Sequence, residues 1–224
     1  MHKEKNFMQA NSSVHRPFTF APELVREHFG KRLPVNFMAQ VGKVLGTISN
    51  SQDSTNITEG PILYSAPLPG ILDWLHGQEN PQILEEKPCM TPLLLYDITP
   101  STERLLFHYE GNPESASLIR HFIELFSLNI QTSQAVIISP RFIPKSKVKE
   151  EQELIQLVRE STADTSFIKF NFNKMGDFWS YAVKHQSTLL VTTKNYQAEL
   201  AKLLFHFYKG GMWYDKLSLY LGKS

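Results

Sequence analysis

The stretch from Arg104 to Phe126 decides the fold of this chain, and it reads RLLFHYEGNPESASLIRHFIELF. It begins with an apolar run of strand length that ends at Glu110 and a glycine. Asn112 then suits the N-cap of a helix, and Pro113 suits its first position, where the missing N–H costs nothing. Apolar residues follow at helical spacing, namely Ala116, Ile119, Ile123 and Phe126. The stretch therefore predicts a strand, a turn and an amphipathic helix.

Strand and helix signals go on alternating after this stretch. The segments that read as strands, from continuous or alternating apolar residues, are Glu103–Tyr109, Ala135–Ser139, Phe167–Phe172, Thr188–Val191 and Lys216–Tyr220. The segments that read as further helices are Lys147–Glu160, Asp177–Val183 and Ala198–Phe207. We expect Asp177 to cap the second of these helices. The order predicts right-handed crossovers and an α/β fold, with a mostly parallel sheet and helices on both faces.

The first half of the chain matches the second half in an ordered series of short segments. The matched pairs are Leu24–Glu27 with Leu157–Glu160, Gly60–Ala66 with Ser187–Thr193, and Thr91–Tyr96 with Lys216–Tyr220. We interpret this series as a duplication, with one copy in residues 1–98 and the other in residues 99–224. The first copy begins near Ser12 and is shortened, because it lacks the opening strand and helix that Glu103–Phe126 supply in the second.

The stretch from Arg104 to Phe126 resembles the first strand and helix of universal stress proteins, in which an apolar strand runs into Asp-Gly-Ser and an amphipathic helix. It is similar above all to tandem members of that family, because Pro92–Tyr96 leads straight into Glu103–Tyr109 as one copy leads into the next. The resemblance covers Glu103 to about Tyr220 well and Ser12–Tyr96 weakly. It implies the fold of the adenine nucleotide alpha hydrolase-like proteins, in two tandem copies.

In nucleotide-binding members of this family, an Asp ends the first strand and contacts the adenosine, and a Gly-x2-Gly-x9-Gly-Ser/Thr loop after the fourth strand holds the phosphates. Glu110 stands at the position of that Asp. After Val191 the chain reads TTKNYQAEL and has no glycine before Gly210, while Met212 stands where Ser or Thr is expected. Such a loop needs glycines, because backbone N–H groups must approach the anion closely. The resemblance therefore implies a decayed nucleotide site.

Polar residues at the ends of the expected strands form a candidate binding site, because open parallel sheets bind ligands at that edge. The candidate residues are Tyr109, Glu110, Gly111, Ser139, Thr192, Thr193 and Lys194. Thr192, Thr193 and Lys194 would offer two hydroxyls and a cation to an anionic ligand. The alternative is that they only start the next helix, with Asn195 as its cap. Of the histidines, His108 is the best placed to contact a ligand at this edge. The alternative is that it is a strand residue that only hydrogen-bonds its neighbours.

Composition and motifs exclude several classes of function. Lys and Arg number 23 against 22 Asp and Glu, so there is no general electrostatic case for nucleic acid or an anionic membrane. The single cysteine, Cys89, excludes an internal disulfide framework and a multi-cysteine metal site. The eight histidines form no HExxH, and the chain has no GxSxG elbow and no Walker A motif. We therefore expect neither a metal site nor hydrolase or kinase chemistry.

The start of the chain and its apolar runs indicate where the protein works. Residues 1–10 are polar and charged, unlike the apolar core of a secretory signal. The longest apolar runs are of strand length, far below the roughly 20 residues of a membrane helix. These observations predict a cytoplasmic protein.

Three functions follow as expectations. The first is a stress-response or regulatory protein that is not an enzyme, has no cofactor, and acts through a homodimer or a protein partner. The second is a protein that binds ATP or another adenine nucleotide through Glu110, Ser139 and Thr192–Lys194, with slow ATPase activity as an option. An interaction module of another complex is a third. The aromatic group Phe205, Phe207, Tyr208, Trp213 and Tyr214 is dense enough to serve as a pairing surface.

The family's sheet has its first strand at the centre, with the second and third strands on one side and the fourth and fifth on the other. Without that central strand, the sheet of the first copy would be split and would leave backbone groups unpaired. Three arrangements would close the gap: a substitute strand from residues 1–14, a second subunit, or strands of the first copy laid against the second copy. We favour the second subunit, because residues 1–14 make a poor central strand.

Overall fold

The computed structural model describes residues 63–76, 79–80, 83–85, 88, 90–96, 100–172, 174–209 and 217–223. Its strands are β1 (Tyr64–Pro67), β2 (Leu93–Tyr96), β3 (Arg104–His108), β4 (Gln134–Ser139), β5 (Asp164–Lys169), β6 (Leu189–Thr193) and β7 (Ser218–Gly222). Its helices are α3 (Leu68–His76), α4 (Pro113–Phe126), α5 (Val148–Ser161), α6 (Met175–Lys184) and α7 (Gln197–Lys209). Two 3₁₀ turns, η1 (Lys145–Lys147) and η2 (Lys194–Tyr196), precede α5 and α7.

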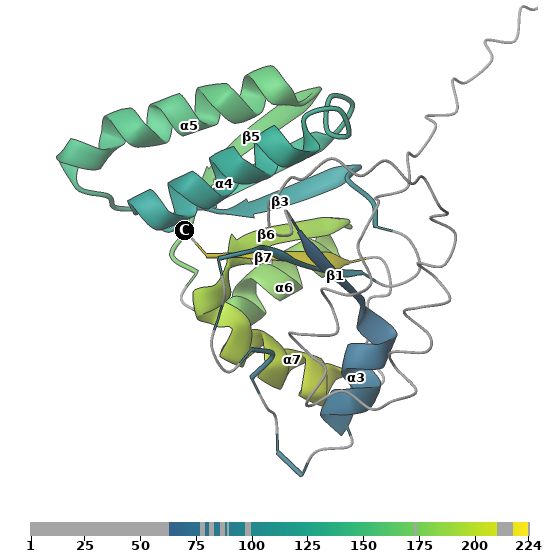
Figure 1. Ribbon diagram of the computed structural model, residues 1–224. Coiled ribbons are helices and arrows are strands. Elements are labelled where there is room, and N and C mark those ends of the chain that lie inside the picture. The colour runs from purple at the N-terminus through teal and green to yellow at the C-terminus, as the bar shows by residue number, and fades with distance from the viewer. Residues whose placement is uncertain are drawn as a thin grey trace, which may run out of the picture.

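The strands form a single sheet in the order β1-β2-β7-β6-β3-β4-β5 (Figure 1). Of the strand pairs in the described part of the chain, only β2 with β7 is antiparallel. The prediction of an α/β fold with a mostly parallel sheet is therefore confirmed. Among the five strands that follow residue 99, β3 lies centrally, with β4 and β5 on one side and β6 and β7 on the other.

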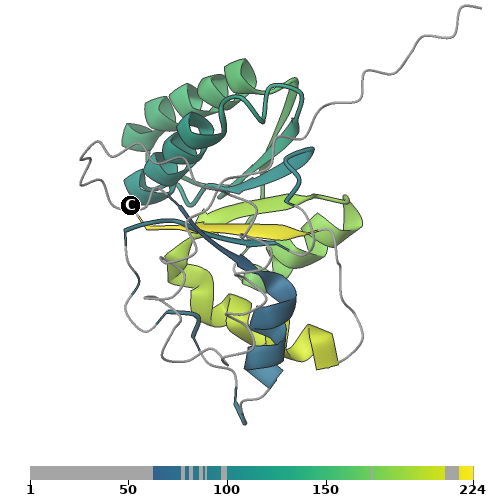
Figure 2. The same cartoon turned by 45° about the vertical axis from the view of Figure 1, so that its right-hand side comes forward.

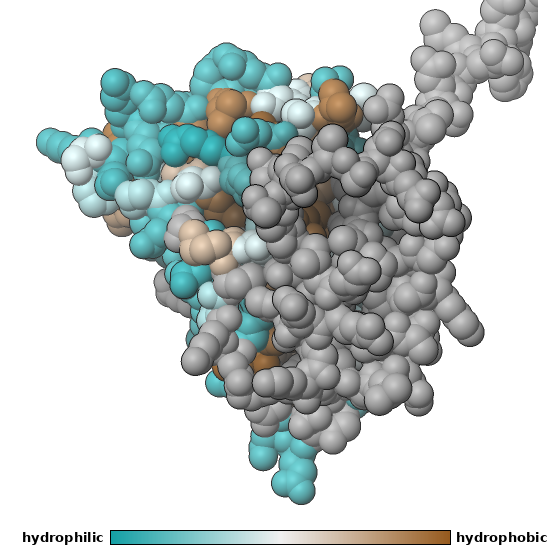
Figure 3. All heavy atoms as spheres, viewed as in Figure 1, coloured by the Kyte–Doolittle hydropathy of each residue, from teal (hydrophilic) through white to brown (hydrophobic). Residues whose placement is uncertain are grey.

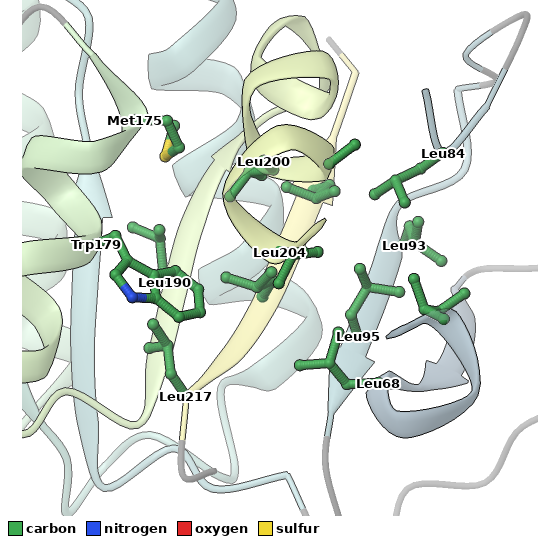
Figure 4. Packing of buried hydrophobic residues seen from close by; sticks show 14 of the residues in the cluster. Leu68, Leu84, Leu93, Leu95, Met175, Trp179, Leu190, Leu200, Leu204 and Leu217 are labelled. Atoms are coloured by element: carbon green, nitrogen blue, oxygen red, sulfur yellow. The ribbon is translucent and has the colours of Figure 1, made fainter. Parts of the chain in front are cut away.

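Helices cover both faces of the sheet (Figures 1 and 2). On one face α4 and α5 pack against strand residues such as Phe107, Val191 and Tyr220. On the other face α3, α6 and α7 pack against residues such as Leu106, Leu190 and Leu219. Neighbouring strand residues thus alternate between two cores, and for that reason these strands are apolar throughout. In the view of Figure 4, Leu200 and Leu204 of α7 lie between Trp179 and Leu93.

The outer surface over α4 and α5 is largely hydrophilic (Figure 3). None of the helices in the described ranges combines the length and the apolarity that crossing a bilayer would require.

The antiparallel junction joins two similar units, β1-α3-β2 and β6-α7-β7. Each unit is a strand, a helix and a parallel neighbouring strand, and α3 and α7 contact each other on the same face. Leu94 of β2 lies opposite Tyr220 of β7. The sheet therefore continues across the boundary predicted at residue 98.

Of the three arrangements expected for the first segment, the described residues show the one in which its strands are laid against the second segment. β1 and β2 reach the rest of the sheet through β7, within one chain. A second subunit is therefore not needed to hold these two strands, and the dimer stays a prediction. The matches in residues 1–62 and the proposed substitute strand lie outside the described residues, as do Cys89, Gly210 and Met212.

The opening of α4 follows the prediction. Asn112 is the N-cap, and its side-chain Oδ1 accepts the N–H of Ser115 at 2.8 Å. Pro113 occupies the first helical position. The start of this helix could therefore be predicted from the sequence, because the residues that determine it are neighbours along the chain.

Three local predictions were wrong. β5 ends at Lys169, three residues before the expected Phe172, because Lys169 pairs with Ser139, the last residue of β4. Asp177 is not the N-cap of α6; it lies one turn in, where its carboxylate accepts the N–H of the actual N-cap, Lys174, at 3.2 Å. Asn195 does not cap α7, because it lies inside the 3₁₀ turn η2 that leads into that helix.

Candidate functional site at the carboxyl ends of the strands

The chain leaves the neighbouring strands β3 and β6 toward opposite faces of the sheet. After β3 the chain enters α4 on one face, and after β6 it enters α7 on the other. Such a reversal leaves a crevice at the carboxyl ends of the two strands, where open α/β sheets bind their ligands. Glu110 follows β3, and Thr193 ends β6. The predicted site residues that meet at this point are Glu110, Gly111 and Thr193.

Glu110 lies half-buried, with hydrogen bonds at both carboxylate oxygens. Thr193 Oγ1 donates to Glu110 Oε1 at 2.8 Å across the strand boundary. Asn112 Nδ2 donates to Glu110 Oε2 at 3.2 Å. The backbone N–H of Glu110 donates to Ser115 Oγ at 3.0 Å. The carboxylate is thus held in place by the turn and by the neighbouring strand.

Gly111 makes the turn that sets this position. Its φ is +74°, in the left-handed region that favours glycine. A Cβ at Gly111 would lie 2.8 Å from Ile143 Cγ2, in the connection after β4. The residue is required both by the backbone conformation and by the close approach of that connection.

His108 and Thr192 lie just below this point, inside the protein. His108 Nδ1 and Thr192 Oγ1 are 2.9 Å apart. The imidazole ring also contacts Phe178, with centroids 3.9 Å apart, and Tyr196, at 4.9 Å. Burial lowers the pKa of His108 to about 3, so the ring is neutral at physiological pH. The structure thus places His108 as a buried, hydrogen-bonded strand residue.

Lys194, the cation expected to face an anionic ligand, is only 2% exposed. Its Nζ lies 2.8 Å from Glu85 Oε2 and donates to the backbone oxygen of Thr91 at 2.8 Å. The side-chain amide of Gln197 bonds the backbone of Glu85. Its Oε1 accepts the Glu85 N–H at 3.0 Å, and its Nε2 donates to the Glu85 carbonyl oxygen at 3.1 Å. The positive charge is therefore neutralised by the segment that precedes β2.

Ser139, at the end of β4, faces α5. Its Oγ donates to Glu151 Oε1, and Lys169 Nζ pairs with the same carboxylate while donating to Ser139 Oγ at 3.3 Å. Beside it, the Tyr109 hydroxyl donates to Glu150 Oε1 at 3.4 Å. Burial, with the two glutamates, raises the pKa of Tyr109 to about 12. Ser139 and Tyr109 thus belong to a separate polar cluster on α5.

Sequence reasoning missed four residues that engage the polar groups of this edge: Glu85, Glu151, Lys169 and Gln197. One of them carried a readable signal. Glu151 precedes Leu154 by three residues and Val158 by seven, so it lies on the apolar stripe of α5, and it is buried with them. A carboxylate on such a stripe needs a partner. Glu85 and Gln197 gave no signal, because their contact joins positions 112 residues apart.

At the reversal point between β3 and β6, the charge that remains is acidic. Burial raises the pKa of Tyr196, and the carboxylates of Glu110 and Glu199 add to that effect. An anionic ligand at the reversal point would therefore meet Glu110 without the help of Lys194. Among the described residues no group of three or more acidic, histidine or cysteine side chains is placed to hold a metal ion.

The chain was compared with known proteins on this basis. No family model matches the sequence, and no curated protein gives a significant match.

Proposed function

We propose that this chain is a universal-stress-type protein that acts without catalysis, through dimerisation or partner binding in stress response or regulation. One observation carries the proposal. The polar groups at the strand ends are engaged with one another, as in the Thr193–Glu110 and Lys194–Glu85 pairs. The hydroxyl donor and the cation of this site already pair with carboxylates of the same protein, so they are not available to the phosphates of a nucleotide.

The arrangement of the strands supports the family part of the proposal. β3 is central, with β4 and then β5 on one side and β6 and then β7 on the other. All of these strands are parallel. This is the order that the resemblance implies for one copy, and on the proposal β1 and β2 would correspond to the fourth and fifth strands of another.

The electrostatics of the edge support the loss of phosphate binding. Phosphate sites combine backbone N–H groups with a lysine or arginine. Here the carboxylate of Glu110 lies at the reversal point, and bringing a polyphosphate near it costs Coulomb energy in a partly buried setting. The described turn after β6 is occupied by a buried lysine that serves Glu85.

Thermal unfolding with adenine nucleotides tests the proposal. A ligand at a hundred times its Kd stabilises by about 2.7 kcal/mol, which is a shift of roughly 5–10 °C for a chain of this size. We expect no shift with millimolar Mg-ATP, ADP or cyclic nucleotides. A saturable upward shift with Mg-ATP would contradict the decayed site.

A second candidate is favoured by the position of Glu110: an adenine-nucleotide-binding protein with an altered pocket, with slow ATPase activity as an option. A carboxylate at a strand end of an α/β sheet can accept ribose hydroxyls. This candidate predicts equal shifts with adenosine and ATP, both lost in Glu110→Gln. Adenosine is therefore the probe that separates the two functions.

A further inference from the structure

Two exposed phenylalanines lie in neighbouring loops at the carboxyl ends of β4 and β5. Phe142 is 80% exposed and Phe170 is 46% exposed. They are the only aromatic residues among the exposed large hydrophobic side chains of the described part of the chain. Single exposed apolar residues need no explanation, but aromatic rings gathered at one place mark interaction surfaces. We call Arg141, Phe142, Phe170 and Phe172 the aromatic patch.

The two loops of the aromatic patch are tied together by two hydrogen bonds from backbone N–H groups. The N–H of Arg141 donates to Asn171 Oδ1 at 3.0 Å. The N–H of Phe170 donates to the carbonyl of Ser139 at 2.9 Å. Phe142 and Phe170 are therefore carried by loops whose positions are fixed relative to each other.

A line of rings anchors the patch in the core. Phe170 stacks on Phe172, with centroids 5.3 Å apart and planes within 3°. Phe172 meets the buried Phe178 edge to face at 5.0 Å, and Phe178 lies against His108. On the other loop the Arg141 guanidinium lies over the Phe142 ring at 5.7 Å. Side chains that are already held lose little entropy on binding, which is the property of strong interface anchors.

The charge around the patch is positive. Residues 140–148 and 165–176 contain five lysines or arginines and no acid. Two of them are engaged, since Lys147 lies 3.9 Å from Glu150 and Lys169 pairs with Glu151. The others, Arg141, Lys145 and Lys174, make no ion pair with the described residues. The exposed rings are thus bordered by cations that remain available to a partner.

From these observations we infer that the aromatic patch docks a segment of a partner protein that carries acidic side chains beside aromatic or aliphatic ones. The apolar side chains would pack on Phe142 and Phe170, and the acidic ones would pair with Arg141, Lys145 and Lys174. The inference rests on the proposed function, because it names the surface through which partner binding takes place.

The local charges favour a protein segment over single-stranded nucleic acid, which also combines stacking with cations. Nucleic acid affinity grows with the number of phosphates that are neutralised. Glu150 and Glu151 already occupy two of the five cations, and Glu110 lies at the end of the adjacent strand. A polyanion would meet these carboxylates, whereas a peptide can place its few acids where the three remaining cations are.

Fluorescence anisotropy with labelled synthetic peptides tests the inference on the full chain. The probes are short peptides that mix aspartate or glutamate with tryptophan and leucine, together with charge-reversed and aromatic-free versions. We expect the acidic aromatic peptides to bind and the other two sets not to bind. Phe142→Ser, Phe170→Ser and Arg141→Glu should each raise Kd by about tenfold or more.

Leu128→Ser is the matched control, because Leu128 is 73% exposed and belongs to the turn after α4. It should leave Kd within about twofold, as surface substitutions away from a site do. The inference is overturned if no acidic peptide binds better than its charge-reversed version, if the patch variants bind as the wild type does, if the patch binds oligothymidylate instead, or if the patch variants abolish self-association. None of these results bears on nucleotide binding, so the proposed function stands or falls by its own thermal test.

Discussion

At the scale of single residues, the candidate site is defined by what each polar group already binds. Glu110 accepts from Thr193 and Asn112, His108 shares a hydrogen bond with Thr192, and Lys194 pairs with Glu85. Each pairing satisfies a group that burial would otherwise make costly. These residues stabilise the strand ends, and substituting them should change the free energy of unfolding.

Gly111 gives the most direct test of the turn. Gly111→Val should lower the free energy of unfolding by about 1–3 kcal/mol, because the residue has a positive φ and a Cβ would crowd Ile143. Urea denaturation measures the change. Gly176→Ala is the matched control, since the nearest atom to its added Cβ is Leu203 Cδ2 at an ordinary 3.7 Å; it should be neutral or slightly stabilising. Equal effects of the two substitutions would contradict the turn.

His108 predicts a dependence of stability on pH. Its pKa is about 3 in the folded protein and ordinarily about 6.5, so below pH 6.5 the unfolded chain takes up a proton that the folded protein does not. The stabilisation is complete above pH 6.5 and is lost as the pH falls toward 3. The slope approaches about 1.4 kcal/mol per pH unit.

The measurement is urea denaturation between pH 7 and pH 5, a range that stays above the ordinary carboxyl pKa values of about 4. His108→Gln keeps a hydrogen-bonding partner for Thr192 and removes the titration. The variant should therefore lose less stability than the wild type over this range. Identical slopes for the two proteins would show that His108 is accessible to protons when folded.

At the scale of elements, the Lys194–Glu85 pair joins η2 and α7 to the segment before β2. Removing one partner leaves a buried charge, so Glu85→Gln and Lys194→Met should each destabilise by about 3–5 kcal/mol. The double variant should recover a large part of that loss, and thermal or urea unfolding measures it. Lys149→Ala, in an exposed pair with Glu153, should cost less than about 1 kcal/mol. Additive losses in the double variant would argue against a direct pair.

The elements themselves were largely predictable, and their partners were not. The alternation from Arg104 onward follows from local periodicity, so each strand and helix after that point was expected near its observed place. The end of β5 was missed, because Phe170 and Phe172 continue the alternating pattern although their rings stack on each other. Glu85 could not be assigned to Lys194, since no local pattern reports a contact 109 residues away.

At the scale of the whole molecule, the sheet is one continuous structure built from two segments. The sequence predicts a parallel sheet for each, but local patterns do not say which edges meet. The choice is made by Leu93 and Leu95 of β2, which pair with β7 and share a core with α7. Apolar strands of this kind bury both faces wherever they pair, and so the junction became visible only in the folded chain.

The β2–β7 junction also sets the order in which the protein can be completed during synthesis. Leu93 pairs with Leu221, near the far end of the sequence. A ribosome that adds about 5–20 residues per second takes roughly 6–25 s to make the chain between them. Throughout that interval the edge of β2 that β7 will occupy has no neighbour. A nascent chain stalled before β7 therefore presents this strand edge to chaperones, and to other nascent chains.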